Sequence, residues 1–188
     1  MGFSAFTALL LVPLSVQAAE VARVQVPDKV QVESRELVLN GAGLRKRFFF
    51  NVYAIGLYLP EKQRDAAAVL SLPGPKRVSL HMLRDVGADT FVEALTEGLK
   101  ANQSEADYQA LEPRVKALTD IMAQVKEAKK GMTIDLDWTG SATRISIDGQ
   151  PTGAPIAGED FYRALLKIWL GDKPVQADLK GALLGETP

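Results

Sequence analysis

Residues 40–59 read NGAGLRKRFFFNVYAIGLYL, and this stretch decides the fold more than any other part of the chain. The run from Phe48 to Leu59 is rich in aromatic and branched residues, a composition typical of a long strand buried on at least one face. Pro60 ends the run, because proline cannot donate a hydrogen bond to a strand ladder. The stretch therefore predicts a central strand that is preceded by the basic residues 45–47.

The segments around this strand predict a chain of alternating strands and helices. Before it, valines alternate with polar residues in two short strands, which Pro27-Asp28 separates. After it, Thr90 with Glu93 fits a capping box, and Pro113 either starts a new helix or kinks an existing one. The expected elements are a helix at 61–72, a strand at 78–83, a helix from 90, helical residues 104–129, strands at 132–138 and 143–147, and helices at 158–170 and 177–184. This segregated order predicts an α+β fold, with helices layered on one face of an antiparallel sheet.

The first eighteen residues have the pattern of an export signal. Residues 3–14 are apolar and uncharged, and Val16-Gln17-Ala18 offers a small-residue cleavage site. A buried N-terminal helix is the alternative interpretation. We expect residues 1–18 to be a signal peptide, residues 19–188 to form a single domain, and the mature protein to be periplasmic or secreted in a bacterium. No later run reaches the ~18 apolar residues of a membrane helix, so no stable span is expected after signal removal.

Composition excludes several classes of function. The chain has 22 basic and 23 acidic residues and a formal net charge of −1, which gives no basis for nucleic-acid binding. It contains no cysteine and one histidine, His81, so thiol chemistry and cysteine- or histidine-rich metal sites are excluded. We therefore expect no metal and no cofactor.

No motif with a fixed mechanism is present. Gly41-Ala42-Gly43 begins like a dinucleotide-binding fingerprint, but position 46 is lysine and no helix start follows. Serine–histidine–aspartate chemistry would need His81, which lies within a predicted strand, and we interpret it as structural.

Arg45 and Arg47 are the candidate ligand-binding residues. They have the same parity on an extended strand, whereas Lys46 faces the other way. An arginine that faces an apolar cavity needs an anionic partner, and its planar guanidinium suits a carboxylate. The alternative, which spacing alone favours, is that residues 45–47 belong to a solvated hairpin loop.

Segment 39–59 resembles the signature of the chalcone isomerase-like family, which includes chalcone isomerases and fatty-acid-binding proteins of the same fold. The resemblance rests on two motifs, Gly41-Ala42-Gly43-Leu44-Arg45 and Tyr53-Ala54-Ile55-Gly56-Leu57-Tyr58-Leu59. The order of the later strands and the helix that ends in Ile168-Trp169-Leu170-Gly171 extend it over about 30–188. It implies an open-faced β-sandwich of the chalcone isomerase type.

The resemblance also implies roles for individual residues. The arginine after Gly-Ala-Gly holds an oxyanion or carboxylate in that family, which gives this role to Arg45. The interval to Tyr53 is shorter than in the plant enzymes, so Arg47 remains an alternative. Tyr53 stands where fatty-acid-binding members carry a tyrosine and catalytic members a threonine.

Phe91 and Gly98 replace a catalytic tyrosine and asparagine. Tyr162, beside Phe161, falls near the last pocket position, with plain core packing as its alternative role.

Three hypotheses of function follow. The first is an exported, non-catalytic protein that binds a fatty acid or similar small amphipathic acid in a cleft between sheet and helices. Its ligand would then be a fatty acid or an aromatic acid. The second is a chalcone isomerase-type intramolecular lyase that uses Arg45. The third is an envelope scaffold that binds an unknown protein partner through an exposed apolar patch.

Overall fold

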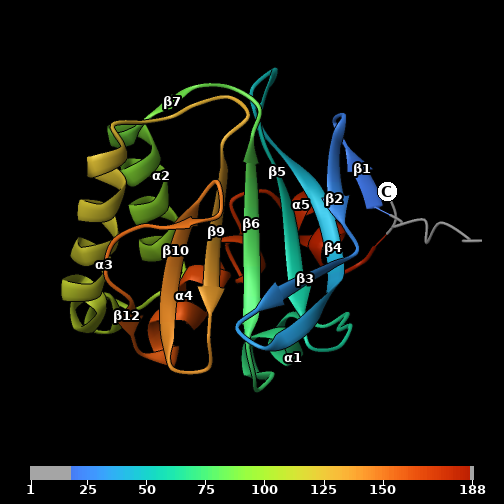
Figure 1. Cartoon of the computed structure of the whole chain (residues 1–188). Coiled ribbons are helices and arrows are strands. Elements are labelled where there is room, and N and C mark those ends of the chain that lie inside the picture. The colour runs from blue at the N-terminus through green and yellow to red at the C-terminus, as the bar shows by residue number, and fades with distance from the viewer. Residues whose placement is uncertain (1–17, 187–188) are drawn as a thin grey trace, which may run out of the picture.

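The computed structural model describes residues 18–186, and a curved antiparallel sheet is its main element (Figure 1). The expected signal peptide, residues 1–18, lies outside the described residues except for Ala18. The large sheet has the strand order β11-β10-β9-β6-β5-β4-β3, and β12 pairs with β10. Its strands are β3 (Lys29–Val32), β4 (Arg35–Arg47), β5 (Phe50–Leu59), β6 (Lys76–Met82), β9 (Thr133–Trp138), β10 (Ala142–Ile147), β11 (Gln150–Pro151) and β12 (Ile156–Ala157).

Two small sheets flank the large one. A hairpin joins β1 (Ala18–Val21) to β2 (Val24–Pro27), and β7 (Val86–Gly87) pairs with β8 (Glu127–Ala128). The helices are α1 (Ala66–Ser71), α2 (Ala88–Ala101), α3 (Glu105–Val125), α4 (Glu159–Leu170) and α5 (Ala177–Leu183). In Figure 1, α4 and α5 lie behind the sheet, while α2 and α3 stand at its β9–β10 side. The predicted α+β fold, with helices on one face of an antiparallel sheet, is confirmed.

The main core lies between the sheet and the helices. Alternate residues of each central strand point into it, which is the period of two that a half-covered sheet requires. From β5 and β6 these residues are Ile55, Leu57, Leu59, Val78, Leu80 and Met82, and all are buried. The apolar face of α4 packs on them through Phe161, Leu165 and Ile168. A second, small core of Val26, Val32, Leu37, Leu39 and Tyr58 lies on the other face.

The structure differs from the sequence-based expectations at two element boundaries and decides between two alternatives at a third. β4 continues to Arg47, so residues 45–47 are strand residues and not a solvated hairpin loop, and the loop is Phe48-Phe49, where the central strand was expected to begin. α2 begins at Ala88 after Gly87, and Thr90 lies inside its first turn, so the expected capping box does not form. Of the two alternatives for Pro113, the start of a new helix is excluded, because Pro113 lies inside one continuous helix, α3. The two overturned expectations rested on local signals, which tertiary packing can override.

Candidate functional site

A cavity of about 620 Å³ lies at the end of the sheet where β4 and β5 meet. Its walls come from that end of β4 and β5, from Leu80 of β6, from α2, and from the segment 168–175. The volume falls within the roughly 300–1,000 Å³ that is usual for small-molecule sites. Side chains of Val52, Leu80, Leu95, Ile168 and Val175 make much of the wall apolar.

The glycines of the Gly-Ala-Gly motif let α5 approach β4. A Cβ at Gly41 would lie 2.6 Å from the carbonyl oxygen of Leu183, and a Cβ at Gly43 would collide with the side chain of Leu179. Asn40 fixes the C-terminal end of this helix, because its Nδ2 donates to the Leu183 carbonyl oxygen at 2.7 Å. The two glycines thus serve close packing, and they lie on the strand that carries Arg45.

Arg45 is a cross-strand partner of Tyr53, and both line the cavity. The side chain of Gln176, at the start of α5, joins β4 through three contacts. Its Oε1 accepts from the Lys46 backbone amide at 2.8 Å and from Arg45 Nη1 at 3.3 Å, and its Nε2 donates to the Leu44 carbonyl oxygen at 3.0 Å. Arg45 Nη1 also donates to the Lys46 carbonyl oxygen. No carboxylate of the described residues pairs with Arg45.

Tyr53 presents a protonated hydroxyl at the same end of the cavity. Burial raises the pKa of Tyr53, although the hydrogen bond from Trp169 and the charge of Arg45 oppose the shift in part. Trp169 Nε1 donates to the hydroxyl oxygen at 3.1 Å. Within the described part of the chain, the Tyr53 hydroxyl donates to no acceptor. Arg45 and Tyr53 together therefore offer charged and neutral donors to a ligand oxygen.

Further charged groups stand around the cavity. Arg47, Arg84 and Lys173 add positive charge to that of Arg45, whereas Asp85 and Glu97 are acidic. Arg84 lies over the ring of Phe50, with its Cζ 4.4 Å from the ring centroid. Cations outnumber anions among the lining residues, which favours an anionic ligand.

Phe91 and Gly98 both line the cavity from α2. Phe91 supplies a ring without a hydroxyl group. Gly98 lies where α2 crosses α4, and a Cβ there would come within 2.9 Å of Ile168 Cγ2. A longer side chain at position 98 would therefore displace Ile168 or α4.

Tyr162 does not lie in the cavity. It is buried in the core, where its hydroxyl donates to the Leu136 carbonyl oxygen at 3.0 Å and its ring lies 6.0 Å from that of Trp138. Trp169, two turns further along α4, lines the cavity instead. Sequence reasoning missed Trp169 and Gln176, whose roles depend on contacts with residues far away along the chain.

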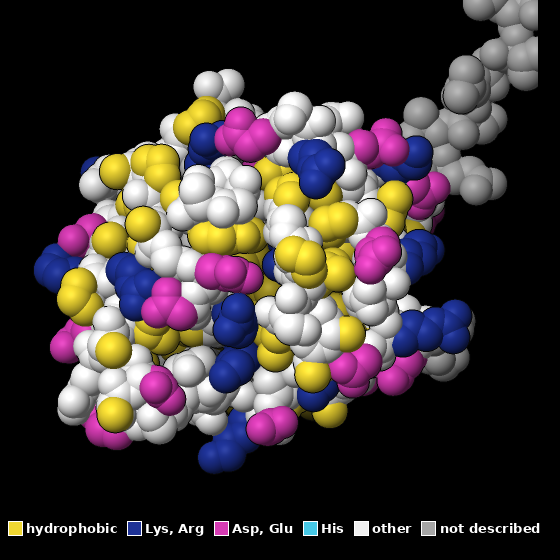
Figure 2. Space-filling view, turned by 90° about the horizontal axis from the view of Figure 1, so that it is seen from below, with side chains coloured by type: hydrophobic (Ala, Val, Ile, Leu, Met, Phe, Trp, Pro, Cys, Tyr) yellow, Lys and Arg dark blue, Asp and Glu magenta, His cyan; other side chains and the backbone are white. Residues whose placement is uncertain are grey.

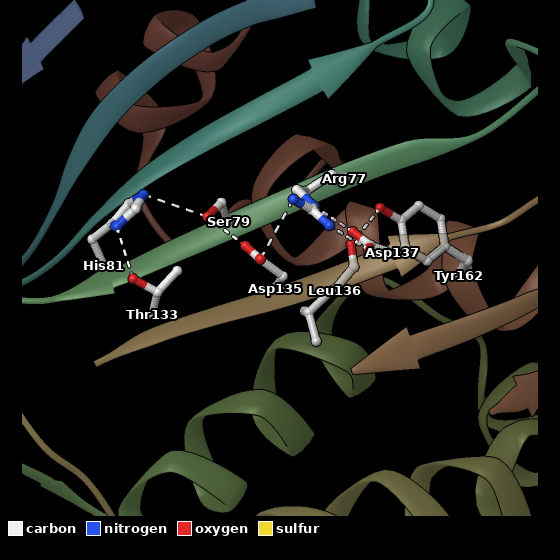
Figure 3. A network of polar contacts seen from close by, with 8 residues as sticks. All are labelled: Arg77, Ser79, His81, Thr133, Asp135, Leu136, Asp137 and Tyr162. Atoms are coloured by element: carbon white, nitrogen blue, oxygen red, sulfur yellow. Dashed lines mark hydrogen bonds and ion pairs between the residues drawn. The ribbon is translucent and has the colours of Figure 1, made fainter. Parts of the chain in front are cut away.

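His81 belongs to a polar network on the sheet face opposite the helices (Figure 3). Ser79 Oγ donates to Asp135 Oδ1 at 2.6 Å, and His81 Nε2 lies 3.4 Å from the same Ser79 oxygen. Serine thus stands between histidine and aspartate, whereas a catalytic triad has histidine in the middle. His81 Nδ1 lies 3.2 Å from Thr133 Oγ1, and Arg77 forms a bidentate pair with Asp137 at 2.6 Å. The network therefore consists of side-chain contacts between neighbouring residues of β6 and β9.

Two kinds of feature are absent from residues 18–186. These residues contain no group of three or more histidine, cysteine, aspartate or glutamate side chains able to hold a metal ion. None of the helices described has the length and apolar character needed to cross a bilayer.

These features define a class: α+β proteins with helices on one face of an antiparallel sheet and a ligand-sized cavity between the two layers. A comparison with protein families identifies the class, because the model of the chalcone isomerase-like family matches residues 18–185. The chain belongs to the chalcone isomerase-like family. A search of curated proteins found no match.

Among solved structures, the fold is similar to that of a fatty-acid binding protein from Arabidopsis thaliana. The TM-score is 0.71 and the sequence identity is 14%, over 89% of this chain and 96% of that chain. At this identity the likeness establishes the fold. The function therefore has to be argued from the site.

Proposed function

We propose that this protein binds a fatty acid or a similar amphipathic acid in the cavity, without converting it. The observation that carries the proposal is Arg45, a cation at the wall of a largely apolar cavity, with no carboxylate partner among the described residues. A guanidinium in such a place is stabilised by an anionic ligand group. The Tyr53 hydroxyl next to it would donate a second hydrogen bond to the same carboxylate. The apolar wall would bind the ligand's tail.

The similar Arabidopsis thaliana protein supports the proposed ligand class, because its name describes fatty-acid binding. Two features of the cavity argue against the isomerase alternative. Phe91 has no hydroxyl to polarise a carbonyl group, and an amide side chain at position 98 would have to displace Ile168 or α4. We expect the rate of hydroxychalcone closure to equal the uncatalysed rate. A rate above background that Arg45→Gln abolishes would favour the isomerase.

Native mass spectrometry tests the proposal and also decides between the two arginines. The samples are wild type, Arg45→Gln and Arg47→Gln, each incubated with a long-chain fatty acid. We expect binding to Arg45→Gln to be about ten- to a hundredfold weaker, because charge-assisted hydrogen bonds are lost. Arg47→Gln is the matched control, and we expect it to bind nearly as the wild type does. The opposite pattern would assign the carboxylate to Arg47, and bare protein in all three samples would reject the proposal.

We also propose that residues 1–18 are removed during export, which leaves residues 19–188 as one domain outside the bacterial cytoplasm. The support is the apolar run at 3–14 with a small-residue site at Val16-Gln17-Ala18. N-terminal sequencing of the protein from a periplasmic fraction should find Ala19 first. A chain that starts at Met1 in the cytoplasmic fraction would contradict export.

A further inference from the structure

The turn between β4 and β5 carries three consecutive exposed phenylalanines. The exposed fractions are 86% for Phe48, 98% for Phe49 and 57% for Phe50, and these are the large hydrophobic side chains that are exposed in residues 18–186. Single exposed apolar residues are common on protein surfaces, but a cluster of three large rings marks an interaction site. We call Phe48, Phe49 and Phe50 the hairpin tip.

Folding does not explain phenylalanine in this turn. Arg47 pairs with Phe50, so Phe48 and Phe49 form a two-residue loop, and Phe48 has a φ of 55°. Glycine is favoured at such a position, because a bulky side chain with positive φ is strained. The rings also bury little of their surface within the chain. The two phenylalanines therefore cost the fold energy and give it little stabilisation in return.

The residues around the hairpin tip are basic. Arg45, Lys46 and Arg47 lead into it, and Arg84 lies over the ring of Phe50. The sequence has no acidic residue between Glu36 and Glu61. At the other end of the molecule, by contrast, basic and acidic side chains are interspersed (Figure 2). The positive charge is thus a local feature of one end, although the net charge of the chain is −1.

The hairpin also projects from the molecule. Tyr53 is the first residue of β5 that pairs with β6, and the part of the β4–β5 hairpin before it extends beyond β6 to the tip (Figure 1). A narrow projecting turn offers too little area for a standard protein interface, which needs about 800 Å² from each partner. It can, however, insert into the soft interface of a lipid bilayer, where aromatic rings are favoured and arginine and lysine contact anionic headgroups.

We propose that the hairpin tip docks the protein on the surface of an anionic lipid bilayer. Phe48 and Phe49 enter the headgroup region, and Lys46, Arg47 and Arg84 contact lipid phosphates. Arg47 and Phe48 are exposed and also line the cavity, so the cavity reaches the surface beside the hairpin. Docking would therefore hold the opening of the cavity against the membrane. The proposal stands on the hairpin alone and does not depend on which ligand the cavity binds.

A site-specific label tests the docking in the full chain, which contains no cysteine of its own. Phe49→Cys and the control Ser141→Cys each carry one environment-sensitive fluorophore. Ser141 is exposed in the turn after β9, at the end of the sheet opposite the hairpin. Vesicles contain phosphatidylcholine alone or equal parts of phosphatidylcholine and phosphatidylglycerol. We expect the label at position 49 to enter lipid only with phosphatidylglycerol, while the label at 141 stays in water.

Unlabelled variants test the two contributions separately by co-sedimentation with the same vesicles. We expect Phe48→Ser/Phe49→Ser to bind roughly tenfold or more weakly than wild type, and Lys46→Gln about fivefold more weakly. All these side chains are exposed, so circular dichroism should be unchanged. A label at 49 that stays in water overturns the proposal. So does a change at 49 that appears without vesicles and grows with protein concentration, since that result would mean self-association.

Discussion

At the scale of single residues, Arg45 and Tyr53 show how a polar end is built into an apolar cavity. The two residues face each other across β4 and β5, so the strand register fixes their spacing. Trp169 holds the Tyr53 hydroxyl from one side, and Gln176 holds the Arg45 guanidinium from the other. These two contacts leave the Tyr53 hydroxyl proton and further N–H groups of Arg45 available to a ligand. The pair is thus oriented before any ligand arrives, which reduces the entropy that binding must overcome.

His81 gives a pH dependence at the same scale. Burial lowers the pKa of His81, although the charge of Asp135 opposes the shift. The unfolded chain, with a histidine pKa near 6.5, therefore takes up a proton more readily than the folded protein does. Well above pH 6.5 His81 is neutral in both states and does not affect stability. As the pH falls through about 6.5, protonation of His81 in the unfolded chain lowers the free energy of unfolding.

We therefore expect His81→Gln to lose less unfolding free energy than wild type between about pH 7.5 and pH 5.5. Glutamine keeps a polar group near Ser79 and Thr133 but does not titrate. Urea unfolding at several pH values in this range measures the difference. If the unfolding free energies of the two proteins depended equally on pH, His81 would not be the source of the pH dependence.

The sequence predicted part of this residue-scale picture. The shared parity of Arg45 and Arg47 follows from the period of a strand, and both residues line the cavity. Tyr162 was a candidate ligand contact but lies in the core, because its position on α4 directs it toward Leu136 and Trp138. Gln176 could not be predicted, since its partners lie about 130 residues earlier in the chain.

At the scale of elements, the packing of α5 on β4 connects the fold to the site. Gly41 and Gly43 allow the contact, Asn40 fixes the C-terminal end of α5, and Gln176 fixes its start beside Arg45. The sequence marked the two glycines as a motif, but their purpose needs the structure. Both lie inside β4, although glycine ordinarily weakens a strand.

This packing predicts a large effect of one methyl group. Gly41→Ala would place a Cβ against the backbone of α5, which cannot move as a flexible side chain does. We expect a loss of unfolding free energy of about 1–3 kcal/mol, together with weaker ligand binding as Gln176 shifts. Gly87→Ala is the control, since nothing lies within 4 Å of a Cβ at that position. It should cost less than about 1 kcal/mol at the start of α2. Equal losses in the two variants, measured by urea unfolding, would contradict the role of Gly41.

At the scale of the whole molecule, the cavity and the hairpin tip lie at the same end of the sheet. The order of strands and helices was sufficient to predict the layered α+β architecture, because each element follows from local periodicity and the layers follow from their order. The cavity could not be predicted in the same way. Its walls come from segments around Arg45, Leu95 and Ile168, and only the tertiary packing of α2 and α4 against the sheet brings these together.

The central claim is that the cavity recognises an acidic head group through Arg45. Calorimetric titration of wild type and Arg45→Gln with a long-chain fatty acid, and with the primary alcohol of the same chain length, tests it most directly. The alcohol keeps the apolar tail but lacks the charge. We predict that the acid binds wild type at least about tenfold more tightly than the alcohol does, and that the difference disappears in Arg45→Gln because charge-assisted hydrogen bonds are lost. Equal affinities of acid and alcohol for wild type, or an acid preference that survives in Arg45→Gln, would contradict the claim.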